Sequence, residues 1–151
     1  MELTARQIES IAIAIHEDYR KNNPRSRFDM PWDSLPEDIR QSNRDQAGEL
    51  TGYIDLLGLT VCACADGKNA EHIEQLADAQ IETVARHIHE VWMKSKEAAG
   101  WVYGRVRDDE KKFHPMLVPY DELEDAEKEK DRAIAGNIAP LLKIAGLAVR
   151  R

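Results

Sequence analysis

The chain has 151 residues, a hydrophobic content of 42% and a formal net charge of -7 at pH 7. This length fits one domain with a modest core, and the acidic balance excludes a general nucleic-acid binder, which would present a basic face. The N-terminus has no basic, apolar leader, and no apolar run approaches the roughly 20 residues that span a bilayer. We therefore expect a cytoplasmic protein that contacts neither nucleic acid nor membrane.

The first predicted element is an amphipathic helix over QIESIAIAIHEDY, residues 7–19. Thr4 stands at the spacing of a capping box with Gln7, which predicts the start of this helix. The apolar residues recur with the i, i+3, i+4, i+7 spacing of one helix face. They are Ile8, Ile11, Ala12, Ile15 and Tyr19.

A second helix is predicted within PWDSLPEDIRQSNRDQAGELTGYIDLLGL, residues 31–59. Ser34 and Glu37 have the spacing of a capping box, and Gly58 marks the end of the helix. The stretch CACADGKNAEH, residues 62–72, is the predicted linker between two halves of the chain.

The cysteines lie in this linker as a C-x-C pair. Cys62 and Cys64 lack partners for a zinc site and are too close together to staple a fold. We therefore expect free thiols in a reducing compartment and no metal site.

A third helix is predicted from about residue 69 to Gly100, and it repeats the first one. QIETVARHIHEVW, residues 80–92, follows the opening helix at an offset of 73 residues. The repeat matches His16 with His89, and Tyr19 with Trp92. Short β-prone runs around a charged turn then predict a hairpin within residues 101–118, pinned to the helices by its aromatic residues.

The last segment, residues 119–147, aligns without a gap to residues 31–59 at an offset of 88 residues. It reads as a helix, and it matches Asn43 with Asp131 and Arg44 with Arg132. The predicted fold is therefore mainly α, with two helix pairs related by a local pseudo-twofold and a short β-hairpin in the second half.

Several motifs in the second half carry a family resemblance. They are HEVW at 89–92, GWVYG at 100–104, RDD at 107–109 and HPMLVPY at 114–120. In this order they resemble the RyR repeat, the ryanodine-receptor-type domain, most strongly from about Ile81 to Leu147. The resemblance implies a single RyR-type domain over residues 1–151. Its first half, about 4–60, is degenerate, and its fuller repeat covers about 70–149.

The resemblance also carries expectations about function. It implies a bacterial or phage-type protein in which channel activity does not carry over. It further implies a ligand-binding or docking module rather than an enzyme, with adenine-nucleotide-like molecules as the leading ligand and no cofactor. The residues agree, because the chain shows no Ser/His/Asp set, Gly-rich phosphate loop or metal cluster.

Tyr19 and Trp92 are the first candidate binding residues. They either cap the core, as aromatic residues at helical spacing usually do, or form opposite walls of a cleft that holds a planar base. His16 and His89 lie at the edge of the same apolar faces, and we favour a structural role for them as partly buried, hydrogen-bonded side chains.

The remaining candidates are polar. Asn43 and Asp131 either bond neighbouring groups or read the edge of a ligand. Arg44, Arg132 and Arg107 either form salt bridges or neutralise a phosphate. The alternative function is a protein-docking module that uses the aromatic hairpin and the acidic helix beginning near residue 121.

Overall fold

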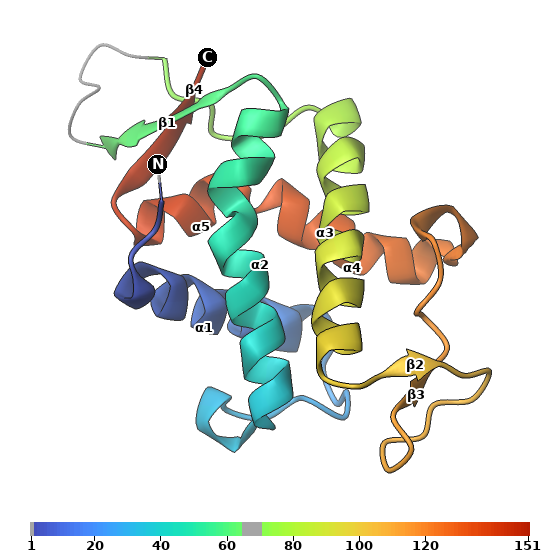
Figure 1. The fold of residues 1–151 in the computed structure, drawn as a ribbon. Helices are drawn as coiled ribbons and strands as arrows, with labels where there is room; N and C mark the ends of the chain where they lie inside the picture. Colours follow the sequence, from blue (N-terminus) through green and yellow to red (C-terminus); the bar gives the residue numbers. More distant parts are fainter. Residues whose placement is uncertain (1, 65–70) are drawn as a thin grey trace.

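The computed structural model describes residues 2–64 and 71–151, and within them the protein is mainly α-helical, as predicted. It contains α1 (Ala5–Asn22), α2 (Glu37–Leu56), α3 (Asp78–Ala98), α4 (Asp125–Gly136) and α5 (Ile138–Ile144). In Figure 1, α2 and α3 stand side by side, and α4 and α5 pass behind them. No helix in the described part of the chain has both the length and the apolar character that a membrane crossing requires.

The two predicted helix pairs are present. α1 packs on α2, α3 packs on α4, and α2 and α3 pack on each other between the pairs. The Thr4 N–H donates to Gln7 Oε1 at 2.8 Å and the Gln7 N–H donates to Thr4 Oγ1 at 3.2 Å, so the predicted capping box opens α1. The apolar faces meet in one core, in which the following side chains are fully buried: Ile11, Leu50, Ile54, Val84, Ile88, Ile138 and Leu141.

Two helices begin later than the sequence predicts. Pro36 occupies the position before α2, so Ser34 lies too far from the first turn to cap it, and the predicted box with Glu37 is wrong. α3 begins at Asp78 rather than near residue 69, and residues 69 and 70 lie outside the described part of the chain.

The second helix of the second half is broken, whereas its counterpart α2 is continuous. α4 ends at Gly136 and α5 begins at Ile138, with Asn137 between them. Pro140 explains the break, because it has no N–H to donate to the Gly136 carbonyl and its ring crowds that group. The equivalent position in α2 is Gly52, which keeps its N–H.

A two-stranded antiparallel sheet, which the sequence analysis does not predict, joins the ends of the two halves. β1 (Thr60–Ala63) pairs with β4 (Leu147–Arg150), and Val61 lies opposite Val149. These valines are 88 residues apart (149 − 61), which is also the offset of the repeat. Each valine therefore pairs with its own counterpart, so the local twofold axis passes between them and the predicted pseudosymmetry is confirmed.

The predicted linker begins inside β1. Cys62 belongs to this strand, Cys64 is exposed, and both thiols are free, as predicted. Residues 65–70 of the linker lie outside the described part of the chain.

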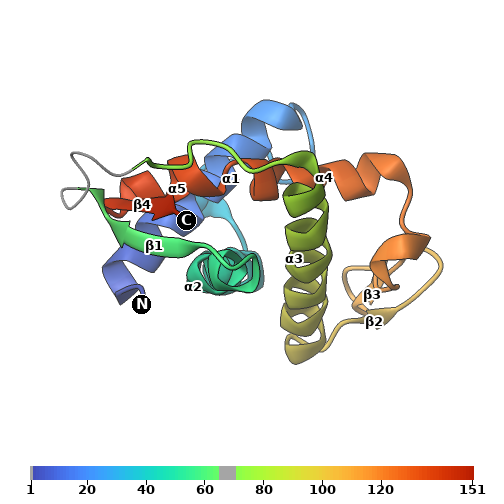
Figure 2. The ribbon, with the colours of Figure 1, turned by 90° about the horizontal axis from the view of Figure 1, so that it is seen from above.

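The segment between α3 and α4, residues 100–118, forms an extension at the opposite end of the molecule from the β1–β4 sheet (Figures 1 and 2). It contains two short strands, but β2 (Val102–Tyr103) and β3 (Phe113–His114) pair in parallel, and residues 116–118, a β-prone run at the end of the predicted hairpin, form no strand. The chain reverses twice between them. The second reversal is closed by reciprocal backbone hydrogen bonds of 2.9 and 3.0 Å between Asp108 and Phe113. The extension is therefore a folded loop rather than the antiparallel hairpin that the β-prone runs suggested.

Candidate functional site

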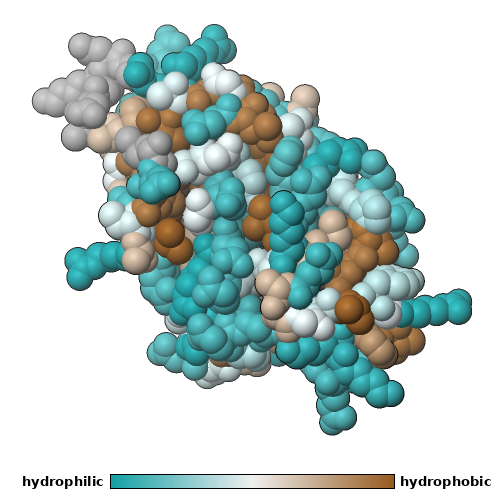
Figure 3. Space-filling model, viewed as in Figure 1, coloured by the Kyte–Doolittle hydropathy of each residue, from teal (hydrophilic) through white to brown (hydrophobic). Residues whose placement is uncertain are grey.

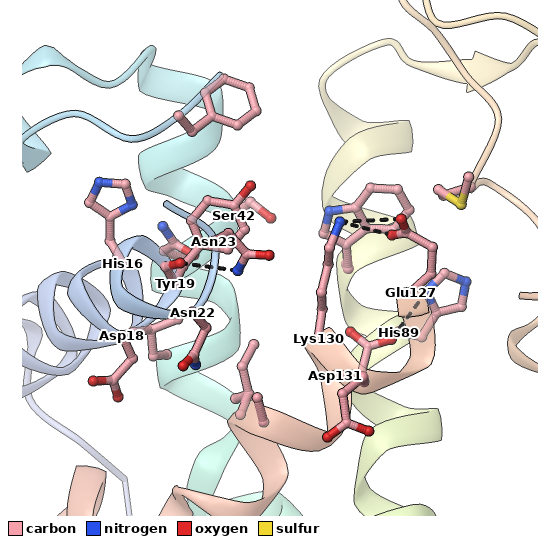
Figure 4. A pocket seen from close by; sticks show the side chains of 18 of the residues that line it. His16, Asp18, Tyr19, Asn22, Asn23, Ser42, His89, Glu127, Lys130 and Asp131 are labelled. Carbon is pink, nitrogen blue, oxygen red and sulfur yellow. Dashed lines mark hydrogen bonds and ion pairs between the residues drawn. The ribbon is translucent and has the colours of Figure 1, made fainter. Parts of the chain in front are cut away.

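A cavity of about 950 Å³ opens between the two halves of the molecule. Figure 4 shows side chains of α1 and α2 on one side of it and side chains of α3 and α4 on the other. The extension contributes the remaining wall. Seven of the nine predicted site residues line this cavity: His16, Tyr19, Asn43, His89, Trp92, Arg107 and Asp131.

Tyr19 and Trp92 line the cavity from α1 and α3, and the structure presents the two rings in the same way. Tyr19 stacks on His16 with ring centres 6.4 Å apart and planes 18° apart. Trp92 stacks on His89 at 5.5 Å and 19°. Each aromatic ring therefore stacks on a histidine of its own helix.

The two histidines are buried and hydrogen-bonded, which is the arrangement expected of structural side chains. His16 Nε2 lies 2.6 Å from the Met30 carbonyl oxygen, and His89 Nε2 lies 2.7 Å from the Val118 carbonyl oxygen. A carbonyl can only accept, so Nε2 carries a proton in both rings. Burial also lowers the pKa of His89, which favours the neutral ring.

Asp131 is the most strongly perturbed carboxyl group in the cavity. Burial raises its pKa to about 7, and Glu127 adds to this effect while Lys130 opposes it. Its Oδ2 lies 3.7 Å from His89 Nδ1. Near neutral pH this group can therefore donate a hydrogen bond as an acid or accept one as a carboxylate. Its repeat counterpart Asn43 lines the same cavity.

Sequence reasoning missed Lys96, which lines the cavity near the end of α3 and is only 4% exposed. Its ammonium lies 5.9 Å from the centre of the Trp92 ring and 5.1 Å from that of Trp101. None of the described carboxylates forms an ion pair with it. Lys96 continues the face of α3 that carries His89 and Trp92, but this spacing alone does not predict that the lysine is buried.

Two groups of the extension lie beside Lys96 in the cavity wall. Arg107 holds its guanidinium 5.5 Å from the centre of the Trp101 ring. His114 contacts Trp92, with ring centres 4.9 Å apart. Burial lowers the pKa of His114 to about 4, and the two nearby cations add to this effect, so the ring is neutral at pH 7.

The comparison with known families concerns the second half of the chain. A family model described as the RyR domain matches residues 68–151, which is more than half of the chain. The chain belongs to the RyR domain family.

The segment matched by the RyR model includes α3, the extension, α4, α5 and β4. It therefore contains Lys96, Trp92 and Asp131, whereas Tyr19 and Asn43 belong to the half that precedes it. The cavity lies between the matched segment and the first half, so both contribute to its walls.

Arg44 and Arg132 do not line the cavity of this RyR domain. Arg44 Nε donates to Glu9 at 2.7 Å, and Arg132 Nε donates to Glu82 at 2.8 Å. The four residues are related by the repeat, and each pair ties the second helix of a half to the first. Their positions therefore recur because the helix packing recurs, and the structure removes both arginines from the candidate site.

The cavity offers aromatic faces, the buried ammonium of Lys96, one guanidinium and the carboxyl group of Asp131, whose pKa is about 7. Other charged side chains also line it, namely Asp18, Glu127, Glu129 and Lys130. Within residues 2–64 and 71–151, no group of three or more His, Cys, Asp or Glu side chains is arranged to hold a metal ion. These groups suit the binding of a planar molecule that carries both an anion and a polar edge.

Proposed function

We propose that this RyR domain is a non-enzymatic ligand-sensing module that binds an adenine-nucleotide-like molecule in the cavity between its two halves. The observation that carries the proposal is that Tyr19 and Trp92, equivalent by the internal repeat, line one cavity. Packing alone accounts for the repeated apolar residues of α1 and α3. It does not require an aromatic residue beyond them in both copies to face the same space.

The size and composition of the cavity support this proposal. Its volume of about 950 Å³ is within the roughly 300–1,000 Å³ typical of small-molecule sites. Stacking on an aromatic side chain is worth about 1–3 kcal/mol per base and accepts any planar ring. Asn43 and Asp131 supply an amide and a carboxyl for the polar edge of the ring.

The experiment is a thermal-shift panel of adenine nucleotides followed by titration calorimetry with any nucleotide that raises the melting temperature. A ligand that binds only the folded state stabilises it. Trp92→Ala should weaken binding by about 1–3 kcal/mol, the worth of one stacked base. Tyr103→Ala is the matched control, because Tyr103 is an aromatic residue of the extension outside the cavity wall.

A panel without any shift would count against the proposal. So would a folded Trp92→Ala variant that binds as tightly as the parent. Equal losses in Trp92→Ala and Tyr103→Ala would move the site from the cavity to the extension.

Protein docking through the extension is the second candidate function, and a different observation favours it. Val102, Tyr103 and Val106 are 53%, 58% and 76% exposed. Figure 3 shows hydrophobic atoms at the surface where the extension lies in Figure 1. Trp101, which the docking hypothesis also used, is 5% exposed and packs inward. A protein partner that binds the parent and Trp92→Ala but not Tyr103→Ala would establish this function instead.

A further inference from the structure

Lys96 is a buried cation with no ion-pair partner among the residues that the structure describes. A charged group loses its hydration when it is buried, and ion pairs or hydrogen bonds usually compensate for that loss. Lys96 is 4% exposed, and no hydrogen bond or ion pair links its ammonium to the described residues. Burial lowers its pKa, while Asp38 and Asp109 act in the opposite direction without pairing with it.

The surroundings of Lys96 concentrate positive charge instead of neutralising it. Arg107 lines the same corner of the cavity and lies over Trp101. Asp109 partly neutralises Arg107, since Arg107 Nε donates to it at 2.9 Å, and Arg27 also binds Asp109, at 2.7 Å. Trp101 is therefore flanked by two cations of the cavity, and Trp92 forms the adjacent wall. Two cations at one end of a cavity in an acidic protein indicate a site for an anion.

We infer that Lys96 and Arg107 form an anion subsite that holds the phosphate of a nucleotide whose base stacks on Trp92. The inference rests on the proposed function, and it also fixes the orientation of the ligand. An α-helix rises about 1.5 Å per residue, so His89 and Lys96 are about 10 Å apart along α3, with Trp92 between them. Asp131 lies at the His89 end. The base edge therefore points to Asp131 and the phosphate to Lys96.

A purely structural role for Lys96 makes different predictions. If the ammonium only fills space between two indole rings, Lys96→Met should loosen this packing and leave ligand selectivity unchanged. If it is the anion subsite, Lys96→Met removes the desolvation cost of a buried charge, so the unliganded variant should be at least as stable as the parent. The two roles are thus separated by the sign of the stability change and by anion selectivity.

The test compares adenosine with AMP by calorimetry, because the two ligands share the base and ribose and differ only in the phosphate. The parent should bind AMP about tenfold or more tightly than adenosine, since charge-assisted hydrogen bonds contribute at least that much. Lys96→Met should lower AMP affinity about tenfold and change adenosine affinity less than about twofold. Lys94→Met is the matched control, because Lys94 is an exposed lysine on the same helix.

Circular dichroism shows whether each variant folds. If Lys96→Met does not fold, Arg107→Gln takes its place in the test. Equal affinities of the parent for adenosine and AMP would overturn the subsite and leave the proposed function intact. If neither ligand binds, pyrophosphate is titrated while the fluorescence of the tryptophans is followed. Saturable pyrophosphate binding that is lost in Lys96→Met keeps the subsite and refutes the nucleotide proposal, whereas no pyrophosphate binding refutes both.

Discussion

Replacing Asp131 with asparagine should raise the free energy of unfolding, and the gain should grow between pH 5 and pH 8. The substitution keeps the shape of the side chain and removes its ionisation. In the folded protein the pKa of Asp131 is about 7, because burial disfavours the carboxylate, against 3.8 for an unperturbed group. The folded state therefore binds more protons than the unfolded state in this window, and raising the pH destabilises the parent.

The size of the stability change follows from the two pKa values of Asp131, which differ by about three units. Each unit of pKa difference corresponds to about 1.4 kcal/mol. The full cost of ionising Asp131 is then about 4 kcal/mol, of which about 2–3 kcal/mol accumulates between pH 5 and pH 8. Below the unfolded pKa the carboxyl is protonated in both states, so the parent and the variant converge there.

The assay is urea unfolding of the parent and the variant at a series of pH values. The difference between their free energies of unfolding is then plotted against pH. The difference is needed because His114 contributes with the opposite sign. Its pKa is lowered from 6.5 to about 4, so the unfolded state binds more protons and stability rises with pH over that range. The reasoning is refuted if the free energies of unfolding of Asp131→Asn and the parent differ by the same amount at every pH from 5 to 8.

Four further predictions concern residues outside the cavity. Arg132→Gln should lower the free energy of unfolding only slightly, because partly exposed ion pairs contribute little to stability, and it should leave calorimetric ligand affinity unchanged. Gly104→Ala should lower the melting temperature, because the added Cβ would lie 2.4 Å from the Cβ of Phe113, which is closer than two carbon atoms can pack. Gly52→Ala should raise the melting temperature through a helix-propensity gain of about 1 kcal/mol, because its Cβ would meet only the Glu49 carboxylate at an ordinary contact distance of 3.5 Å. Replacing both Cys62 and Cys64 with serine should leave the circular dichroism spectrum and ligand binding unchanged, and a metal lost with this change would contradict the prediction.

The internal repeat made most of the fold predictable, because it ties each helix to a counterpart with the same apolar spacing. The β1–β4 sheet was missed even though its signal was in the sequence. The predicted repeat aligns residues 31–59 with residues 119–147. Val61 and Val149 continue this match two residues further at the same offset. Each strand has only four residues, which is too short for alternation to distinguish it from a loop.

The candidate site was predictable only in part, for a physical reason. The repeat identifies equivalent residues, but equivalence arises from packing as readily as from binding. Arg44 and Arg132 recur because they hold helix pairs together, whereas Tyr19 and Trp92 recur on the walls of a cavity. Lys96 has no equivalent in the aligned part of the first helix, and a lysine near a helix C-terminus is usually solvated there. Its burial depends on the fold of the extension, which no local pattern reveals.

The pairing of Val61 with Val149 bears on how such a chain could originate. A strand that pairs with its own counterpart across a twofold axis has the geometry of an isologous interface between two identical subunits. One copy of the repeat alone would leave this edge unpaired, and a symmetric homodimer would satisfy it. Duplication and fusion make the contact intramolecular, so its formation no longer depends on protein concentration. Once fused, the two copies are free to diverge. The second copy carries the extension with its cationic corner, and the first carries a tyrosine facing the shared space.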